Sequence, residues 1–331
     1  MASLKKLISK LLGGSCSTAV FALTTKCNCR CVMCGMHRKP PETMELERAK
    51  KALKFFAENE FLMVYFTGGE PTLHPDILEI VGFANKLGLF TVLSTNGTLS
   101  EDLLQGLRKA GLNVLTVSLD HWRPEICEKI RGVKGIMQQQ EHALRYAKAI
   151  GLKVYALVYI NPYLVHEGVE KMVKYVDSYL DVPIGFCYPT ASDVNTYELH
   201  GDFKEEDLNR KLKRSILKLI QLKKLGYRIV NTITYLEDIL RLSAKPNFYC
   251  KGGENVFYVD WRGDVYPCFL KDKLFNLFED EPRLLKDIEC DECFTNCFRE
   301  PSIIPQLFKS PKILFKESRY SLHIMDLVLQ L

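Results

Sequence analysis

The cysteines of this chain are concentrated in two places, one near each end of the sequence. The chain has 331 residues and twelve cysteines, of which nine lie within residues 27–34 and 250–297. Thiolates at short spacing bind zinc or iron–sulfur clusters. We expect no secretory signal peptide, because the basic N-terminus precedes only a short apolar stretch that ends at Gly13-Gly14. Disulfides are rare in a reducing cytosol, so the two groups predict two thiolate-rich metal sites.

The first group has the spacing Cys27-x3-Cys31-x2-Cys34. Three thiolates without an obvious fourth ligand leave an open coordination position, as catalytic metal sites do. A closed zinc site that uses His37 as its fourth ligand is the alternative. The cysteines outside the two groups are expected to pack as small buried side chains. They are Cys16, Cys127 and Cys187.

Apolar runs alternate with amphipathic helical patterns through most of the chain. We expect strands at residues 17–24, 62–68, 89–97, 113–120, 153–161 and 182–190. Helical patterns occupy residues 44–59, 76–86, 124–130, 136–149, 166–179 and 203–225, with a further helix after a predicted N-cap at Ser100. This alternation predicts parallel βαβ units with right-handed crossovers. The predicted fold class is therefore α/β, with a partial (β/α)6 TIM-like barrel whose chemistry lies at the strand ends.

The pattern changes after about residue 245. Residues 257–268 predict a hairpin around Arg262-Gly263-Asp264. The last cysteines of the second group lie close together in the sequence after this hairpin. We therefore expect a small C-terminal cysteine-rich domain beside the barrel. The predicted parts are an amphipathic N-terminal helix, the barrel core, the cysteine-rich domain and a basic and apolar C-terminal tail, at residues 1–16, 17–245, 246–300 and 301–331.

Five segments occur in the order typical of one enzyme superfamily. The Cys-x3-Cys-x2-Cys spacing after the first predicted strand resembles that of the radical S-adenosylmethionine (SAM) superfamily. The later segments resemble the GGEP motif of that superfamily, its third-strand and fourth-strand motifs and the arginine-glycine segment that follows. They are residues 67–71 (TGGEP), 94–97 (STNG), 117–120 (VSLD) and 130–132 (IRG). The chain is thus identified as a member of this superfamily over roughly residues 17–300.

The resemblance implies an enzyme and its cofactors. Cys27, Cys31 and Cys34 would bind three irons of a [4Fe–4S] cluster, and SAM would chelate the fourth. An electron from a reductant such as ferredoxin or flavodoxin would pass through this cluster and cleave SAM to methionine and a 5′-deoxyadenosyl radical. The resemblance places the SAM pocket at Gly68, Gly69, Glu70, Asn96, Ser118, Arg131, Ile160 and Tyr188.

Individual roles in this pocket follow from the same resemblance. The two glycines would let the backbone approach the SAM amino group closely. Ser118 and Arg131 would hold the methionyl carboxylate, with Asn96 beside them, and the adenine would lie near Ile160 and Tyr188. A role in turns or caps is the alternative for Asn96 and Ser118. The sequence assigns no catalytic acid or base.

Four residues near these motifs depart from the usual pattern or carry other chemistry. Met33 stands where many members have an aromatic residue before the third cysteine. Cys29 lies between the expected ligands and is expected not to bind iron. His121 stands where many relatives have glycine, and we expect it at the surface or at a helix start. His74 is expected to have a structural role.

The second cysteine group resembles the SPASM and Twitch auxiliary-cluster domains. Cys250, Gly263 and Cys268 match the opening of that motif, and Asn276-Leu277 resembles its next segment, with Phe275 in place of a glycine. Five thiolates fit one [4Fe–4S] cluster and cannot hold two fully. A zinc site is the alternative interpretation. The expected ligands are Cys250, Cys268, Cys290 and Cys293, with Cys297 as the alternative ligand.

Both ends of the chain carry weak membrane signals. Residues 3–12 predict a helix with apolar side chains on one face and lysines on the other, and residues 303–316 place lysines among apolar residues. Two such signals together can attach a protein to the inner face of a membrane. Our first hypothesis is therefore hydrogen abstraction from an unactivated C–H bond of a lipid or other apolar membrane-associated substrate, in C–C bond formation or a similar reaction. Packing against the barrel is the alternative for both segments.

Other substrates fit the same motifs. A peptide or a small polar metabolite is the second hypothesis, although peptide modifiers often carry an N-terminal domain and only about sixteen residues precede the first predicted strand. A zinc-binding protein without catalysis is the third. The net charge is only +5, and no apolar run reaches the ~18 residues that a transmembrane helix needs. We therefore expect a cytoplasmic protein that can lie on a membrane surface and binds no nucleic acid.

Overall fold

The computed structural model describes residues 17–190, 206–240 and 248–328. Its strands are β1 (Ser17–Ala22), β2 (Phe61–Thr67), β3 (Phe90–Thr95), β4 (Val114–Ser118), β5 (Val154–Tyr159), β6 (Ile184–Cys187), β7 (Val256–Val259), β8 (Asp264–Tyr266) and β9 (Phe275–Asn276). Its α-helices are α2 (Leu46–Glu58), α3 (Ile77–Lys86), α4 (Glu101–Ala110), α5 (Pro124–Arg131), α6 (Ile136–Ala149), α7 (Pro162–Glu167), α8 (Val169–Lys174), α9 (Glu206–Lys224), α10 (Ile233–Ile239), α11 (Asn296–Lys309) and α12 (Pro311–Val328). The six predicted barrel strands and the predicted hairpin are present.

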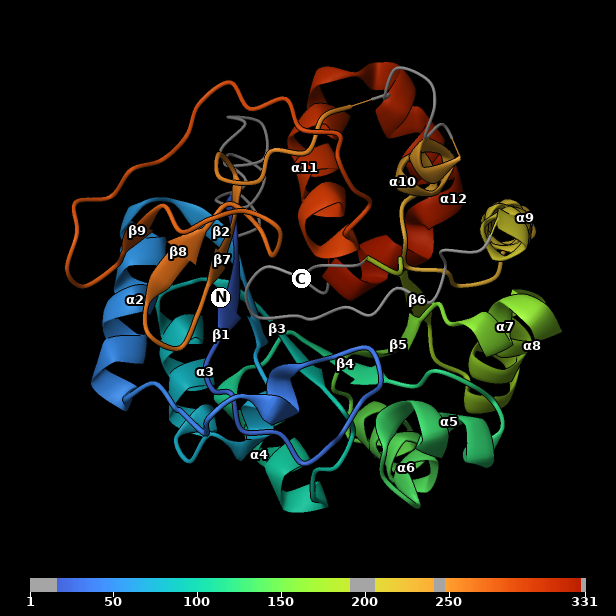
Figure 1. Cartoon of the computed structure of the whole chain (residues 1–331), viewed down its shortest axis with the longest axis horizontal. Helices are drawn as coiled ribbons and strands as arrows, with labels where there is room; N and C mark the ends of the chain where they lie inside the picture. The colour runs from blue at the N-terminus through green and yellow to red at the C-terminus, as the bar shows by residue number, and fades with distance from the viewer. Residues whose placement is uncertain (1–16, 191–205, 241–247, 329–331) are drawn as a thin grey trace.

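One sheet runs through both the barrel and the cysteine-rich segment. Its strand order is β6-β5-β4-β3-β2-β1-β7-β8-β9. Strand β7 pairs in parallel with β1, and β8 and β9 continue the sheet in antiparallel fashion. Helices α2 to α8 follow one another along one face of the curved sheet, while α11 lies on the other face (Figure 1). The predicted α/β class with a partial barrel is confirmed, and the hairpin after residue 245 extends the barrel sheet.

Local chemistry explains how the elements begin, end and pack. Ser100 is the N-cap of α4, as predicted, because its hydroxyl accepts a hydrogen bond from the amide of Leu103 at 3.3 Å. Gly111 ends the same helix with a φ of 87°, a left-handed conformation that suits glycine. In the core, the ring of Phe21 on β1 packs edge-on against Phe56 of α2, with ring centroids 5.5 Å apart. These contacts fasten the helices to the sheet and hold the strand ends in place.

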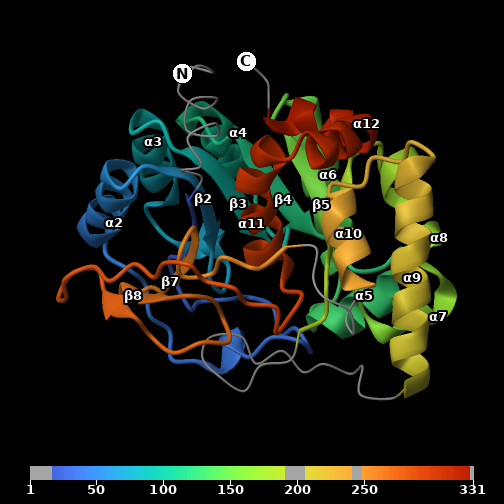
Figure 2. The same ribbon diagram turned by 90° about the horizontal axis from the view of Figure 1, so that it is seen from above.

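The segment expected as a C-terminal tail forms two helices that pack on the fold. Helix α11 lies between β7 and α10, and α12 packs against both α10 and α11 (Figure 2). The carboxylate of Glu317 on α12 accepts hydrogen bonds from the amides of Ile233 and Thr234, at 3.1 and 2.7 Å, and so caps the start of α10. Packing against the fold, the alternative interpretation of this segment, is therefore what the described residues show. The predicted N-terminal helix at 1–16 lies outside the described residues.

Two further expectations differ from the structure. The single helix expected at 166–179 is divided into α7, α8 and a π-helical turn at Tyr175–Leu180, with a break at Gly168, where φ is 98°. His121 is fully buried and its ring stacks on Trp122, so the surface position expected for it is wrong. It lies at the start of α5, the other position expected, where its Nδ1 accepts a hydrogen bond from the amide of the N-cap residue Arg123 at 3.1 Å. Among the described residues, no helix is both long and apolar enough to cross a membrane.

Candidate metal and cofactor site

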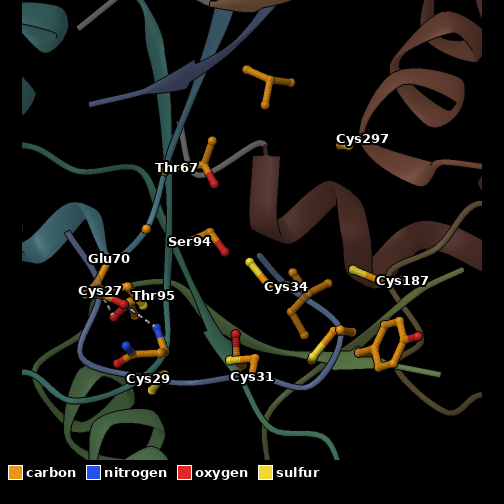
Figure 3. A pocket seen from close by; sticks show the side chains of 18 of the residues that line it. Cys27, Cys29, Cys31, Cys34, Thr67, Glu70, Ser94, Thr95, Cys187 and Cys297 are labelled. Atoms are coloured by element: carbon orange, nitrogen blue, oxygen red, sulfur yellow. Dashed lines mark hydrogen bonds between the residues drawn. The ribbon is translucent and has the colours of Figure 1, made fainter. Parts of the chain in front are cut away.

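A cavity of about 240 Å³ lies where the parallel strands end. One side is formed by the cysteine loop at 27–34 and by the segments that follow β2, β3 and β4. The other side is formed by the end of β6 and by residues of the cysteine-rich segment, among them Phe269 and Cys297. Figure 3 shows Cys34 and Cys187 reaching into this cavity from opposite sides, with Thr67 and Ser94 along its wall. Both cysteine groups of the sequence therefore contribute residues to one cavity.

The cysteine loop is held in place by the end of α5. The amide of Arg30 donates to the carbonyl of Arg131 at 3.0 Å, and the amide of Val32 donates to the carbonyl of Ile130 at 2.9 Å. A Cβ on Gly132 would lie 2.6 Å from the carbonyl oxygen of Arg30, and the φ of this glycine is 68°. The arginine-glycine segment therefore needs glycine because the cysteine loop passes so close to it.

The three expected ligands of the first cluster have different thiol acidities. A hydrogen bond from the Cys29 thiol, assisted by the charge of Arg131, lowers the pKa of Cys31 to about 6. Hydrogen bonds from Cys29 also lower the pKa of Cys27, whereas burial raises the pKa of Cys34 to about 12. Because a metal binds the thiolate, these ligands bind with release of whatever protons they still carry. Cys29 itself is buried, and its hydrogen bonds to Cys27 and Cys31 raise its own pKa.

The two glycines after β2 allow a second close approach to the cysteine loop. A Cβ on Gly68 would lie 2.4 Å from the carbonyl oxygen of Thr24, and a Cβ on Gly69 would lie 2.3 Å from that of Lys26. The amide of Gly69 donates to Thr24 at 2.7 Å, and the amide of Glu70 donates to Lys26 at 2.7 Å. The glycines are thus already required by the packing of two loops, in addition to any approach to a ligand.

Glu70 joins the loop after β2 to the loop after β3. Its fully buried carboxylate accepts hydrogen bonds from the Thr72 amide at 3.2 Å, the Thr95 hydroxyl at 2.8 Å and the Asn96 amide at 2.7 Å. Burial raises the pKa of Glu70, and these donors oppose that rise. The side chain of Asn96 in turn donates to Asn28 of the cysteine loop at 2.6 Å. Glu70 and Asn96 therefore position three loops around the cavity.

Asp120 holds Arg131 at the cavity wall. The buried Asp120 carboxylate accepts a hydrogen bond from Nε of Arg131 at 2.5 Å and another from the amide of Tyr159 at 2.8 Å. Nη1 of Arg131 lies 3.7 Å from Sγ of Cys31. Arg131, Ser118 and Tyr188 all line the cavity, but Ile160 does not, and Tyr159 lines it instead. Successive strand residues point to opposite faces, so a shift of one position exchanges these two side chains.

The second cysteine group forms a compact set of thiols. Cys250 and Cys290 pair through backbone hydrogen bonds of 2.8 and 3.4 Å. Burial raises the pKa of Cys268 to about 12, and the neighbouring thiols of Cys293, Cys250 and Cys290 add to this rise. Burial likewise raises the pKa of Cys297, and the neighbouring thiols of Cys187, Cys293 and Cys268 add to this rise. All five thiols of the second group thus have others of the group as neighbours, and Cys297 also lines the cavity.

Arg299 fastens this set of thiols to the rest of the fold. It is 1% exposed and donates to Asp238 at 2.6 Å and to the carbonyls of Cys290 and Cys293 at 3.4 Å each. No local sequence pattern indicates this role, because Asp238 lies 61 residues away. Asp120 was also missed as a site residue, although it stands in the VSLD segment.

The donor sets fit iron–sulfur clusters. Each set combines three or four cysteine thiols on short segments, which is the ligand type that such clusters use. Within the described ranges, no three Cys, His, Asp or Glu side chains are grouped closely enough to hold a single metal ion. A cluster of four irons holds its thiolates farther apart than one ion does.

Comparison with known proteins identifies the family of this chain. The model of the radical SAM superfamily matches residues 21–177. A probable GTP 3′,8-cyclase of Saccharolobus solfataricus is 31% identical over 248 residues, which cover 70% of this chain and 75% of that protein. The chain belongs to the radical SAM superfamily. SAM and a [4Fe–4S] cluster are typical of this superfamily, and its enzymes need an electron donor.

Other radical SAM relatives match a shorter region. The Fe-coproporphyrin III synthase of Methanosarcina barkeri is 34% identical over 157 residues, and an AdoMet-dependent heme synthase of Oleidesulfovibrio alaskensis is 31% identical over 144 residues. These matches cover 45% and 42% of this chain but only 39% and 37% of those proteins. The matched region is therefore less than half the length of each of these two curated relatives.

Solved radical SAM-type structures share the fold along most of the chain. Streptococcus suis SuiB bound to the precursor peptide SuiA gives a TM-score of 0.63 at 17% identity, covering 83% of this chain and 66% of SuiB. The structure of anSMEcpe with bound AdoMet and the Kp18Cys peptide gives a TM-score of 0.61 at 22% identity, covering 88% of this chain and 84% of that one. The similarity thus extends beyond the region that the family model matches.

Proposed function

We propose that this radical SAM enzyme carries two [4Fe–4S] clusters and modifies a peptide or a small polar metabolite. The first cluster is bound by Cys27, Cys31 and Cys34, and the second is a Twitch/SPASM-like auxiliary cluster. The observation that carries this proposal is the single cavity that residues of both cysteine segments line. A substrate held in it would contact the first cysteine loop on one side and residues of the cysteine-rich segment, among them Cys297, on the other. The auxiliary ligands are Cys250, Cys268, Cys290 and Cys293, with Cys297 left as a cavity side chain.

The residues on the first side of the cavity bind and orient SAM. When bound, the cluster and SAM supply the electron transfer and the 5′-deoxyadenosyl radical that abstracts hydrogen from the substrate. Arg131 presents a guanidinium held by Asp120 to the methionyl carboxylate, and Ser118 lies on the same wall. Tyr188 offers a ring near the end of β6 for the adenine, and Ile160 supports the neighbouring backbone from the core. Glu70 acts through Asn96 as a positioning residue, since its oxygens are occupied by loop donors.

The walls of the cavity combine uncharged polar side chains with apolar ones. The polar side chains include Tyr65, Ser94, Thr190, Thr295 and Asn296, and the apolar ones include Val20, Leu157 and Phe269. The polar groups can orient a polar substrate through hydrogen bonds, while the apolar side chains contact its carbon skeleton. SuiB and anSMEcpe, which share the fold, are described with bound peptides.

The lipid hypothesis has no support in these observations. The segment that suggested it near the C-terminus forms helices α11 and α12 on the fold, and the other segment lies outside the described residues. A peptide or small polar metabolite, which began as the second hypothesis, is therefore the preferred substrate class. The auxiliary cluster would accept an electron from the substrate radical, because four cysteine ligands leave no open position for direct substrate coordination.

The test is SAM cleavage after anaerobic reconstitution with iron and sulfide. We expect a brown protein that converts SAM to 5′-deoxyadenosine with dithionite, measured by liquid chromatography and mass spectrometry. Cys31→Ala should abolish this cleavage, whereas Cys268→Ala should retain cleavage and form no substrate product. Peptides encoded beside the gene and polar metabolite fractions should stimulate cleavage, and phospholipid vesicles should not. A colourless protein that leaves SAM intact, or stimulation by vesicles alone, would contradict the proposal.

A further inference from the structure

Two threonine hydroxyls connect the cavity to a cysteine of the second group. Sγ of Cys293 lies 3.4 Å from Oγ1 of Thr295, which in turn lies 3.1 Å from Oγ1 of Thr190. The two threonines are only 7% and 9% exposed, and both line the cavity. A continuous chain of polar contacts therefore runs from the cavity wall to the sulfur of Cys293.

The backbone holds both hydroxyls in place. The carbonyl of Thr295 accepts hydrogen bonds from the amides of Phe298 and Arg299, at 3.2 and 3.0 Å, where α11 begins. On the other side, the hydroxyl of Thr190 donates to the carbonyl of Tyr188 at 3.5 Å, which is long for a bond between two oxygens. The contact between the threonines thus joins the segment after β6 to the start of α11.

The hydroxyl of Thr295 has one proton and two neighbouring acceptors once Cys293 binds a metal. As a thiol, Cys293 donates to Thr295, and Thr295 donates to Thr190. A metal-bound cysteine has lost its proton, so it can only accept a hydrogen bond. The sulfur of Cys293 and the oxygen of Thr190 then compete for the proton of Thr295. The charged acceptor forms the stronger bond, so this proton turns mainly toward the sulfur.

We propose that Thr295 and Thr190 are positioning residues that set the reduction potential of the auxiliary cluster in opposite directions. A hydrogen bond to a ligand sulfur makes the potential less negative, because it stabilises the negative charge that reduction adds. Thr295 supplies this bond to Cys293, and Thr190 weakens it from the cavity wall by competing for the same proton. A less negative potential favours acceptance of an electron from the substrate radical. This rests on the proposed function, since it needs Cys293 as a ligand of the auxiliary cluster.

Ser302 on α11 offers a matched comparison. Its buried hydroxyl lies 3.9 Å from Sγ of Cys250, another expected ligand of the auxiliary cluster. The proton of this hydroxyl has a closer acceptor in the carbonyl of Phe298, at 2.7 Å. Among the described residues that line the cavity, Ser302 does not appear. Ser302→Ala therefore removes a buried hydroxyl beside an auxiliary ligand but no close donor to its sulfur.

The first experiment is a redox titration followed by electron paramagnetic resonance. It uses the full chain with the three cysteines of the first cluster replaced by alanine, so that only the auxiliary cluster gives a signal. In this background, Thr295→Val should make the midpoint potential more negative, and Thr295→Ser should restore it. Thr190→Val should make it less negative, and Ser302→Ala should shift it less than either valine variant. No shift in Thr295→Val, or a shift of the same sign in Thr190→Val, would overturn the proposal.

A double variant separates this relay from a general change in cavity polarity. Thr295→Val/Thr190→Val should have the potential of Thr295→Val alone, because Thr190 acts only through the proton of Thr295. Additive shifts would overturn the relay. Each variant should keep the iron content of the background, about four per chain. If Thr295→Val assembles no cluster, Thr190→Val decides, since an unchanged potential there also overturns the proposal. A background protein without any cluster would instead count against the proposed function.

Discussion

At the scale of single residues, buried carboxylates hold the groups that surround the cavity. Asp120 carries this role most clearly, because its two oxygens are shared between Arg131 and the backbone of Tyr159. The charge that it balances lies 3.7 Å from Sγ of Cys31. Breaking a buried ion pair from one side leaves an uncompensated charge, which costs more than the pair contributes.

Replacement of Asp120 by asparagine should weaken SAM binding. The new side chain would turn an amide group toward the guanidinium or toward the Tyr159 amide, so Arg131 would lose its fixed position. We expect the SAM dissociation constant of the reconstituted enzyme to rise by about tenfold or more, which is roughly 1.4 kcal/mol. Equilibrium dialysis with labelled SAM measures this. Iron content should stay at the wild-type value, and Asp102→Asn on the exposed face of α4 is the control. Unchanged SAM affinity in Asp120→Asn would show that Arg131 does not depend on Asp120.

Sequence patterns predicted the motif residues better than their partners. Arg131 and Glu70 could be singled out because each stands in a short motif. Their actual contacts are set by loops that meet only after folding, and no spacing in the chain encodes them. The exchange of Ile160 for Tyr159 has a simpler cause. In a continuous apolar run such as residues 154–160, the sequence does not show which side chains point to which face of the sheet.

At the scale of elements, α11 connects the cysteine-rich segment to the barrel. Arg299 lies between the rings of Phe248 and Phe294, 4.8 and 5.2 Å from their centroids, and bonds Asp238 of α10. The next residue on the chain, Glu300, accepts hydrogen bonds from the amide of Thr232 at 2.7 Å and from Asn231 at 3.0 Å. The helix thus fixes the second thiol group and the end of the barrel together.

Removing the Arg299 charge should destabilise this junction. Arg299→Met keeps much of the side-chain volume but leaves Asp238 buried without its partner. We expect a loss of roughly 3–5 kcal/mol in the free energy of unfolding, measured by urea denaturation. The variant should also incorporate less iron at the second site, since the Cys290 and Cys293 carbonyls lose their donor. Arg283→Met, at an exposed position, should change stability by no more than about 0.5 kcal/mol. Equal stability of the two variants would refute this role.

Glu300 should make stability depend on pH. Burial raises its pKa from 4.5 to about 7, so the folded state binds more protons than the unfolded chain between these values. The free energy of unfolding should therefore fall as the pH rises through that window, by about 3 kcal/mol at most from this group. Urea denaturation at about pH 5 and about pH 7.5 measures the slope. Glu300→Gln should show a flatter dependence, and an identical slope in both proteins would contradict this assignment.

The elements themselves were largely predictable, and their long-range packing was not. Period and capping signals predicted the strands and most helices of the barrel, as the Ser100 cap illustrates. The C-terminal segment was ambiguous, because lysines among apolar residues suit a membrane surface and a helix packed on a fold equally well. Glu317 resolves the ambiguity, but its partners at Ile233 and Thr234 lie more than eighty residues away.

At the scale of the whole molecule, one nine-stranded sheet brings the first cysteine group and part of the cysteine-rich segment, including Cys297, to one cavity. The parallel pairing of β7 with β1 achieves this, because it sets the cysteine-rich segment beside the first strand and its cysteine loop. Sequence patterns predicted two separate thiol sites and offered no means of deciding whether they share a substrate. The shared cavity supports the proposal that one substrate is handled between them.

Iron and sulfide analysis with electron paramagnetic resonance tests the two-cluster proposal most directly. The wild type should hold about eight irons per chain, and replacement of Cys27, Cys31 and Cys34 by alanine should leave about four. Replacement of Cys250, Cys268, Cys290 and Cys293 should also leave about four, with the signal of the other cluster retained. Cys297→Ser and the buried control Cys127→Ser should keep about eight. Loss of about four irons in Cys297→Ser, or full iron content in the fourfold variant, would contradict the assignment of the auxiliary cluster.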